Sequence, residues 1–313
     1  QKKLNMKILG IGNAIVDVLC RVDEEFLIQN SLTKSTMKLI DEEEFKNLIS
    51  LLNIEETISG GSVANSIVGL SQLGNDVGFV GKVKNDNLGQ KYEDGLKKEK
   101  VNYLYSKKDE PFPTGSCLIL ITPDSERTMC TFLGTAGRIN DTDINENDVK
   151  SAELTFLEGY LWDEGEPKKA FDKAIINSNK IAMSLSDVFC VERHKSQFLK
   201  LVENKLDIVF ANEQEILSLI NSTSFDEAIS FSKNLKKNII ITRGEKGAIS
   251  IKGNEIFECP AEKNLKITDL TGAGDLFAAG YLHGVINKIS IQESLIKGTE
   301  LSSKIIQKVG ARI

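Results

Sequence analysis

The sequence predicts an α/β fold: a three-layer α/β/α core with a mostly parallel, doubly wound sheet, and a small β-sheet beside it. Through most of the 313 residues, short β-branched runs alternate with longer amphipathic patterns, as in successive βαβ units. Two stretches, 15–40 and 101–133, contain strand-like runs without helices between them. We therefore expect a core domain of residues 1–14, 41–100 and 134–313, and a discontinuous lid domain of residues 15–40 and 101–133.

The core elements follow in order along the chain. Buried runs predict parallel strands at Ile8–Gly12, Val77–Val83, Thr155–Leu161, Ile181–Leu185, Ile208–Phe210 and Ile239–Thr242. Helical patterns lie between them, at Ser62–Leu73, Leu88–Lys100, Pro167–Ser178, Arg193–Glu203, Glu213–Ile220 and Phe225–Leu235. A hairpin, Ala248–Ile251 with Glu255–Glu258, then precedes two long helices, Gly272–Asn287 and Ile291–Val309.

The expected lid is a small, mostly antiparallel sheet. Its strands are Ile15–Val22, Met37–Ile40, Tyr103–Lys107, Ser116–Thr122 and Thr128–Leu133. A sheet assembled from two separated insertions cannot lie inside a doubly wound core, so we expect it over the edge of the main sheet.

Composition excludes several classes of protein. The net charge of −6 argues against a nucleic-acid binder, which would present a basic face. No apolar run approaches the ~18 residues that span a bilayer, and Asn13 and Asp17 interrupt the apolar start that faintly resembles a signal peptide. Five scattered cysteines and two histidines argue against a zinc site and favour buried free thiols in a cytoplasmic protein.

The most informative segment runs from Thr268 to Phe277, where Gly272, Ala273 and Gly274 stand at the start of a helix. The first turn of a helix leaves free N–H groups at the positive end of the dipole, and small residues let an anion approach them. This arrangement suits a phosphoryl group in transfer. Asp275, in the first turn, could accept a proton from an attacking hydroxyl, or it could simply cap the helix.

A second group of polar residues follows the first strand. Asn13 and Asp17 lie just past its carboxyl end, where open α/β sheets bind ligands. An amide and a carboxylate can bridge the vicinal hydroxyls of a sugar, although turn or N-cap roles explain each residue equally. The dinucleotide fingerprint fails here because Ile15 occupies the position of its third glycine, and no P-loop is present.

Two motifs resemble signatures of the ribokinase-like (PfkB) carbohydrate kinase family. They are Asp269-x-Thr271-Gly272-Ala273-Gly274-Asp275 and Ser59-Gly60-Gly61-Ser62-Val63-Ala64-Asn65-Ser66. The resemblance extends from Gly10 to Ala311 and is nearest to the branch of adenosine kinases and bacterial sugar kinases. It implies the ribokinase-like fold, with Asp17 binding sugar hydroxyls and Gly60, Gly61 and Asn65 forming the second arm of that clamp.

On the phosphate-donor side, the resemblance assigns Asn212 and Glu215 to an Asn-x-x-Glu motif that governs Mg²⁺ through water. The same pair also reads as a capping box. Thr242 and Gly244 match the family's Thr-x-Gly loop, which lies near the nucleotide, although a simple turn into the hairpin also explains them. Arg127 matches a lid arginine that reaches the phosphates in the family, although a solvated turn also explains it. Gly298 lies on a helix that, by the resemblance, walls the adenine site, although helix packing explains the glycine as well.

Two further assignments concern the cation and the base. Asp269 and Thr271 resemble a loop that holds a monovalent cation such as K⁺ in some family members. Phe132 and Leu133 are candidates for the wall of a nucleoside pocket, although lid core explains them better.

Together these features predict an ATP- and Mg²⁺-dependent kinase that phosphorylates the primary hydroxymethyl of a sugar or ribonucleoside. The partner is this small molecule, and the protein is expected to be a monomer or a homodimer through the lid. A catalytically silent sugar- or nucleoside-binding regulatory protein is the alternative, which an intact Asp275 disfavours. A third hypothesis, an NAD-dependent dehydrogenase, is disfavoured by the broken fingerprint at Ile15.

Overall fold

The main sheet of the computed structural model, which describes residues 5–163 and 166–313, has nine strands. From one edge to the other they are β14 (Glu255–Cys259), β13 (Ala248–Lys252), β12 (Asn238–Thr242), β11 (Ile208–Asn212), β10 (Ile181–Ser184), β9 (Leu154–Glu158), β1 (Ile8–Ile11), β5 (Val77–Val80) and β6 (Asn102–Tyr103). Neighbours from β6 to β12 pair in parallel, whereas β12–β13 and β13–β14 are antiparallel.

The strand order reverses at β1. From β1 the chain continues to β5 and β6 on one side, and then crosses to β9 and proceeds outward through β10, β11 and β12 on the other. Such a reversal opens a crevice at the carboxyl ends of the strands, because the flanking connections depart to opposite faces. The sequence segments that follow β1, β9, β10, β11 and β12 therefore converge at this crevice.

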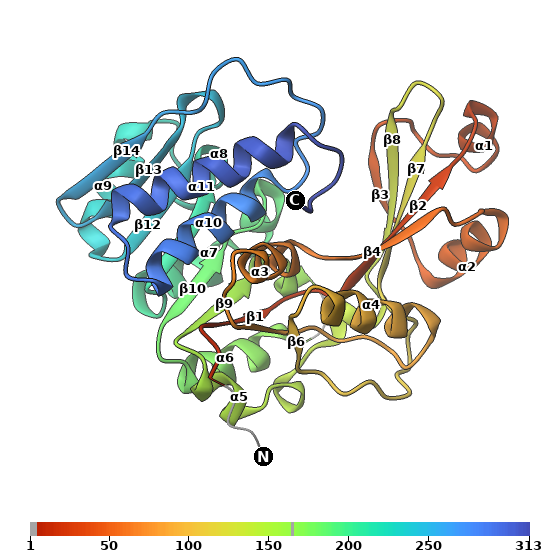
Figure 1. Cartoon of the computed structure of the whole chain (residues 1–313), viewed down its shortest axis with the longest axis horizontal. Helices are drawn as coiled ribbons and strands as arrows, with labels where there is room; N and C mark the ends of the chain where they lie inside the picture. Colours follow the sequence, from red (N-terminus) through yellow and green to blue (C-terminus); the bar gives the residue numbers. More distant parts are fainter. Residues whose placement is uncertain (1–4, 164–165) are drawn as a thin grey trace.

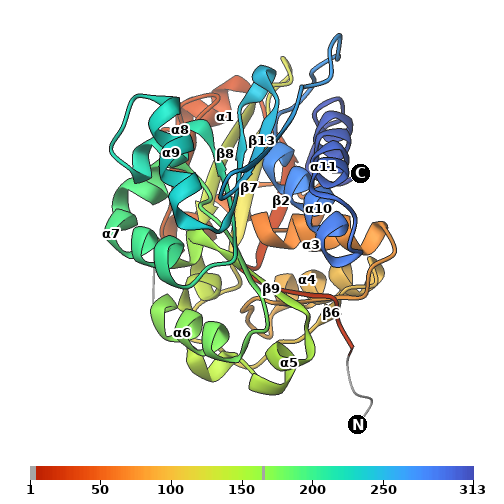
Figure 2. The same cartoon turned by 90° about the vertical axis from the view of Figure 1, so that its left-hand side faces the viewer.

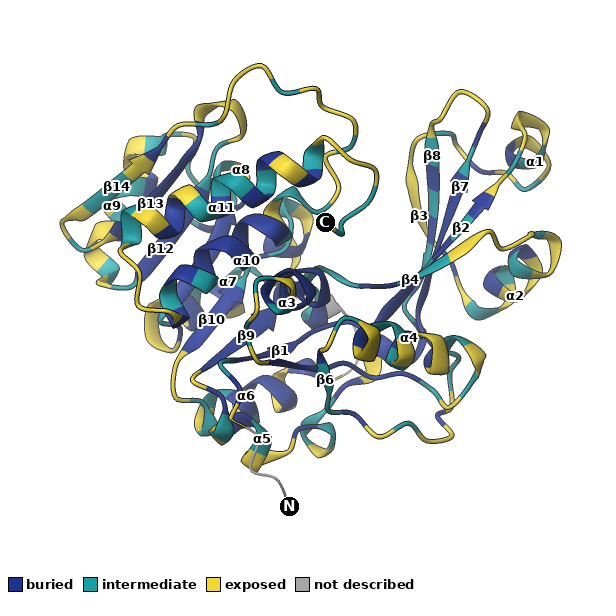
Figure 3. Ribbon diagram, in the orientation of Figure 1, coloured by how far each residue is buried: buried dark blue, intermediate teal, exposed yellow. Residues whose placement is uncertain are grey.

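Helices cover both faces of the sheet, as Figure 2 shows. One layer comprises α3 (Ser62–Gln72), α4 (Asn87–Lys98), α10 (Ala273–Ile286) and α11 (Ile291–Ile306). The other comprises α5 (Glu146–Ser151), α6 (Pro167–Asn177), α7 (Val188–Asn204), α8 (Glu213–Leu219) and α9 (Phe225–Leu235). Each layer packs on its own apolar cluster, and the strands between are the most buried part of the molecule (Figure 3). This confirms the predicted three-layer, doubly wound core.

Short helical turns complete the core, at Gly134–Arg138, Asp141–Asp143, Gly159–Asp163 and Gly244–Lys246. The third of these replaces the end of the strand expected at Thr155–Leu161, because the chain leaves the sheet after Glu158. The five cysteines are all buried and free, as predicted. Within the described part of the chain, no helix has the length and apolar character needed to cross a membrane.

The small sheet stands at one side of the core (Figure 1). Its strands, in spatial order, are β3 (Met37–Leu39), β8 (Arg127–Phe132), β7 (Ser116–Ile121), β2 (Ile15–Arg21) and β4 (Glu56–Gly60), and α1 (Glu24–Gln29) and α2 (Glu42–Leu51) accompany them. The prediction that it is mostly antiparallel is wrong, since β2–β7 and β3–β8 are parallel. Val16 pairs with Ser116, so the two insertions leave the core side by side and their first strands run outward together.

Two segments lie in a different sheet from the one expected. The predicted lid strand at Tyr103–Lys107 is instead β6, which pairs with β5 at the edge of the main sheet and places the Tyr103 hydroxyl on the carbonyl oxygen of Gly81 at 2.5 Å. Conversely, β4, inside the range 41–100 assigned to the core, pairs with β2 of the small sheet. Phe45 of α2 also stacks on Phe132 of β8, with ring centroids 5.2 Å apart. Residues 1–4 of the expected core lie outside the described residues.

Candidate active site

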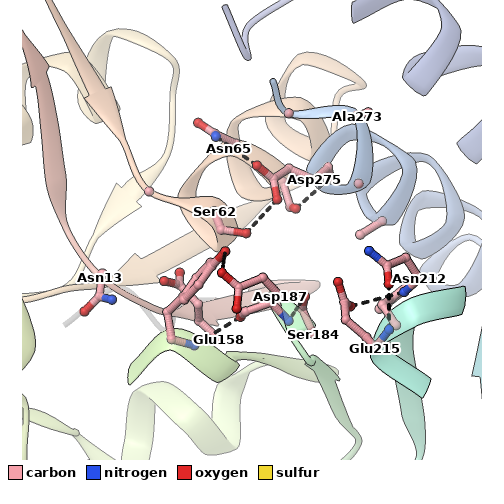
Figure 4. Close-up of a pocket in the computed structure, with 18 of the residues that line it drawn as sticks. Asn13, Ser62, Asn65, Glu158, Ser184, Asp187, Asn212, Glu215, Ala273 and Asp275 are labelled. Atoms are coloured by element: carbon pink, nitrogen blue, oxygen red, sulfur yellow. Dashed lines mark hydrogen bonds between the residues drawn. The ribbon is translucent and has the colours of Figure 1, made fainter. Parts of the chain in front are cut away.

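A cavity of about 1160 Å³ lies at the carboxyl ends of the main strands, between them and the small sheet. Figure 4 shows that side chains from α3, α10 and the segments after β1, β9, β10 and β11 face the same space. The structure brings most of the predicted residues to its lining: Asn13, Asp17, Gly61, Asn65, Asn212, Glu215, Thr242, Gly244, Gly272, Ala273, Gly274 and Asp275.

Asp275 is held by three side chains of α3. The Ser62 hydroxyl donates to its Oδ1 at 2.6 Å and the Asn65 amide to its Oδ2 at 3.0 Å, while Ser66 Oγ donates to its backbone oxygen at 2.7 Å. Burial raises the pKa of the Asp275 carboxyl, and the two side-chain hydrogen bonds together with the charge of Arg312 oppose that rise. These hydrogen bonds fix the orientation of the Asp275 carboxylate, and the residue lines the cavity.

The glycine turn before Asp275 has the predicted form. Gly272 adopts φ +80°, a left-handed conformation that favours glycine, and α10 begins at Ala273 without a side chain capping its first turn. Outside its own helix and chain neighbours, no described atom lies within 4 Å of the position that a Cβ would occupy at Gly274, so there is free space beside this residue, which lines the cavity. The N–H of Ala273, expected to bind phosphoryl oxygen, instead donates to Leu270 O at 3.2 Å.

The acceptor half is built around Asp17 and Asn13. The carboxylate of Asp17 lies directly over Gly60, where an added Cβ would come within 2.6 Å of its Oδ2. Burial raises the pKa of Asp17 to about 7, opposed by the charges of Arg312 and Arg127. Asn13 Oδ1 is buried with no hydrogen-bond partner among the described residues. An orphaned acceptor that lines a cavity fits a ligand hydroxyl, because leaving it unpaired costs free energy.

Gly61 explains how the two arms meet. Its φ is +105°, and a Cβ there would lie 2.2 Å from the backbone oxygen of Asn13. Only glycine allows the start of α3 to approach the segment after β1 this closely. The glycine of the second signature motif thus sets the close approach of α3 to Asn13.

Glu158, at the end of β9, was missed by the sequence analysis because it was read as part of a longer strand. Its side chain accepts from Val63 N at 3.1 Å and from Asn13, and burial raises its pKa to about 8. The buried Glu158 thus joins the partly buried Asp17 and Asp275, so that three carboxyls lie in this half of the cavity. The signal that could have found it is an acidic residue closing an otherwise apolar strand at the crevice.

On the donor side, Asn212 and Glu215 form the reciprocal capping box of α8. Glu215 N donates to Asn212 Oδ1 at 2.8 Å and Asn212 N to Glu215 Oε1 at 3.1 Å. Burial raises the pKa of Glu215 to about 7. Asp187, another residue that sequence reasoning missed, caps α7 nearby through Cys190 N and accepts from the Tyr160 hydroxyl at 2.9 Å. Ser184 and Ser186 complete this side of the lining.

The donor set fits a metal held through water. Across residues 5–163 and 166–313, no cluster of three or more His, Cys, Asp or Glu is arranged to hold an ion. Mg²⁺ keeps several waters and binds through few carboxylates together with substrate phosphates, which agrees with Glu215 and Asp187 lining the cavity singly.

Some predicted residues lie away from the cavity lining. Arg127 pairs with Asp269, its Nη1 3.3 Å from Oδ2, and Asp269 also accepts from Thr271 N and Gly310 N. These donors occupy the carboxylate that was assigned to a monovalent cation. A Cβ added at Gly298 would lie 2.8 Å from the backbone oxygen of Phe277. Gly298 therefore allows the close contact between α11 and α10 and does not line the cavity. Phe132 packs in the lid core, whereas Leu133 lines the cavity.

Comparison with known proteins agrees with this geometry. A glycine turn at a helix start beside an aspartate is the arrangement expected of a phosphoryl-transfer site. The family model described as pfkB family carbohydrate kinase matches residues 33–313. The chain belongs to the pfkB family of carbohydrate kinases. Its fold matches the ribokinase-like structures of adenosine kinases.

Both nucleoside and sugar kinases occur among its relatives. Adenosine kinase 2 of Arabidopsis thaliana is 26% identical, with 97% of this chain and 94% of that protein covered. The crystal structure of adenosine kinase from Sinorhizobium meliloti is 35% identical with a TM-score of 0.88, over 99% of this chain and 96% of that one. A probable sugar kinase from Rhizobium etli CFN 42 is 36% identical with a TM-score of 0.87, over 99% and 95% of the two chains.

Proposed function

We propose that this chain is an ATP-dependent kinase that transfers the γ-phosphoryl group to the primary hydroxymethyl of a sugar or ribonucleoside, with a ribonucleoside as the favoured acceptor. The observation that carries the proposal is the partly buried Asp275, fixed by Ser62 and Asn65 at a helix start that no side chain caps. A carboxylate in that place can orient an attacking hydroxyl and accept its proton as the phosphoryl group transfers.

The two halves of the cavity have complementary chemistry for this reaction. Asp17 and Asn13 would bind ribose hydroxyls, and the amides of Gly272 and Gly274 at the start of α10 would bind the transferring phosphoryl group. Asn212, Glu215 and Thr242 lie toward the donor, where Glu215 would hold Mg²⁺ through water. The metal supplies positive charge that offsets the charge on the phosphates. Closure of the small sheet over the acceptor would exclude water from the transfer.

An apolar wall favours a nucleoside over a simple sugar. Ile15, Cys117 and Leu133 of the small sheet line the cavity, with Met37 and Leu39 beside them. Met37 is 54% exposed and Leu39 63%, so this wall is open to a ligand. A base has apolar faces that such a wall would bury, whereas a monosaccharide has little to place there.

A coupled assay of ADP release over nucleosides and monosaccharides tests the proposal. We expect turnover with adenosine or another ribonucleoside to exceed turnover with ribose or fructose. The matched control is 5′-deoxyadenosine, which lacks only the acceptor hydroxyl; it should compete with adenosine for binding but release no ADP. Absence of ADP over the whole panel, with binding intact, would instead indicate the silent binding protein. Turnover with monosaccharides alone would assign the chain to the sugar kinases.

A further inference from the structure

The segment that follows α11 delivers an arginine to the acceptor half of the cavity. Gly310 N donates to Asp269 Oδ2 at 3.0 Å, which fastens the segment to the loop before α10. Ala311 then lies against Gly272, where an added Cβ would come within 2.6 Å of the Cβ of Ala311. These two contacts place the next residue, Arg312, in the space between α3 and the small sheet.

Arg312 is bound to two neutral oxygens. Its Nη1 donates to Asn65 Oδ1 and its Nη2 to the backbone oxygen of Ser59 in β4. Because the oxygen of the Asn65 amide accepts from the guanidinium, the nitrogen of that amide is directed at Asp275 Oδ2, 3.0 Å away. A continuous path of donors and acceptors therefore runs from Arg312 through Asn65 to the carboxylate of Asp275.

Arg312 is also a partly buried positive charge among acidic groups. Its charge lowers the pKa of both Asp17 and Asp275, against the larger effect of burial. A guanidinium that is partly withdrawn from water and bonded to neutral oxygens is costly unless nearby carboxylates are ionised. The charged and titratable groups around this region come from several elements: Asp17 (β2), Tyr92 (α4), Glu99 after α4, Arg127 (β8), Glu158 (β9) and Asp275 (α10).

We propose that Arg312 is a positioning residue for phosphoryl transfer: it fixes the Asn65 amide so that it donates to Asp275, and it places a positive charge that favours the ionised forms of Asp17 and Asp275. By binding Ser59 as well, it ties β4 of the small sheet to α3 of the core. The inference rests on the proposed kinase function, but it concerns a residue outside both signature motifs.

Two substitutions separate the two parts of the role. Arg312→Ala removes charge and hydrogen bonds, and should lower kcat on the order of 10- to 100-fold by releasing Asn65 and Asp275. In the pH profile of kcat/KM for the acceptor, the fall on the acid side (the acid limb) should also shift to higher pH. The reason is that Asp17 and Asp275 lose a neighbouring cation, which raises their pKa values. Arg312→Lys keeps the charge without the planar fork, so the limb should stay near its wild-type pH while kcat remains reduced. Free guanidinium should restore part of the turnover of Arg312→Ala.

The matched control is Arg21→Ala. Arg21 also lies in the small sheet, but its side chain is 70% exposed and pairs with Glu55 outside the cavity. This variant should keep the wild-type kcat and pH profile. Thermal unfolding of each variant identifies a loss of fold, and Arg312→Lys provides the test if Arg312→Ala does not fold.

The outcomes distinguish this inference from the proposed function. A wild-type protein that releases ADP, beside an Arg312→Ala variant with unchanged kcat and pH limb, overturns the positioning role alone. A folded Arg312→Ala variant that loses turnover without a displaced limb and without guanidinium rescue also overturns it. If the wild type phosphorylates nothing, the proposed function fails. The affinity for adenosine, measured by calorimetry as a function of pH, then tests the charge role without turnover. If the pH at which this affinity falls is higher in Arg312→Ala than in the wild type, the charge role is supported; if it is unchanged, the charge role is contradicted.

Discussion

Asp275 receives two hydrogen bonds, from the Ser62 hydroxyl and the Asn65 amide. Replacing Asp275 by Asn removes the proton acceptor, and the Ser62 hydroxyl can rotate to accept from the new amide N–H₂. We expect kcat to fall on the order of 10²- to 10⁴-fold with the fold retained. Steady-state kinetics and thermal unfolding check this. Asp94→Asn, an exposed position on α4, is the control, and near wild-type turnover by Asp275→Asn would remove the assigned base.

Asp17 should control affinity for the acceptor. Hydrogen bonds to a charged group contribute enough that Asp17→Asn should raise the acceptor KM about 10- to 100-fold and leave the ATP KM nearly unchanged. Because burial raises the pKa of Asp17 to about 7, protonation below that pH removes acceptor capacity from the carboxyl. The wild-type acceptor KM should therefore rise as the pH falls through 7. Equal effects on the two KM values would contradict a sugar clamp at this residue.

At the scale of the element, α8 shows how one residue can serve structure and chemistry together. Glu215 completes the capping box with Asn212 and lines the cavity with a carboxyl whose pKa burial raises to about 7. Glu215→Gln preserves the cap, since glutamine serves equally at that position, but removes the charge. We expect a higher Mg²⁺ concentration for half-maximal rate and an almost unchanged melting temperature.

A titration of rate against Mg²⁺ measures this effect, with excess chelator as the zero point. Glu213→Gln is a suitable comparison, since Glu213 lies in the same first turn but pairs with Arg243. If Glu215→Gln and Glu213→Gln changed the Mg²⁺ dependence equally, Glu215 would have no specific role in holding the metal.

Elements with local signals could be predicted from the sequence, and elements defined by distant partners could not. The start of α10 and the capping box of α8 depend on residues within one turn, so their motifs located them correctly. In contrast, β4 and β6 are short strands whose sheet is decided by a neighbour far along the chain, β2 or β5. Asp187, the N-cap of α7, was overlooked because the helix was expected to begin only at Arg193.

The same limit applies to the site at the scale of the whole molecule. The two signature motifs predicted Asn65 and Asp275 as site residues, and the polar segment after the first strand predicted Asp17. All three line one cavity although they come from three separate segments. Glu158 and Arg312 carry no motif, and only the strand order and the packing of Ala311 against Gly272 bring them to the same place. Charge balance in a buried site is a property of the folded chain, so short sequence patterns could not indicate it.

This concentration of buried carboxyls gives the unliganded protein a characteristic pH dependence of stability. Burial raises the pKa of Glu158 from 4.5 to about 8, of Asp17 to about 7 and of Glu215 to about 7. Between the unfolded and folded pKa values, the folded state holds protons that the unfolded chain has released. Stability from these groups is thus fully present below the unfolded pKa and is lost as the pH rises through the folded values.

We therefore expect the melting temperature of Glu158→Gln to decline less than that of the wild type as the pH rises from 5 to about 8, and the difference between the two to level off above about 8, because the neutral amide has no proton to lose. Each carboxyl can contribute a slope of up to about 1.4 kcal/mol per pH unit in this window. Glu153→Gln, at a half-exposed glutamate just before β9, should follow the wild-type curve. Calorimetric melts across this range make the comparison. Parallel curves for the wild type and Glu158→Gln would show that Glu158 is already ionised in the folded protein at pH 5, so that burial does not hold its proton.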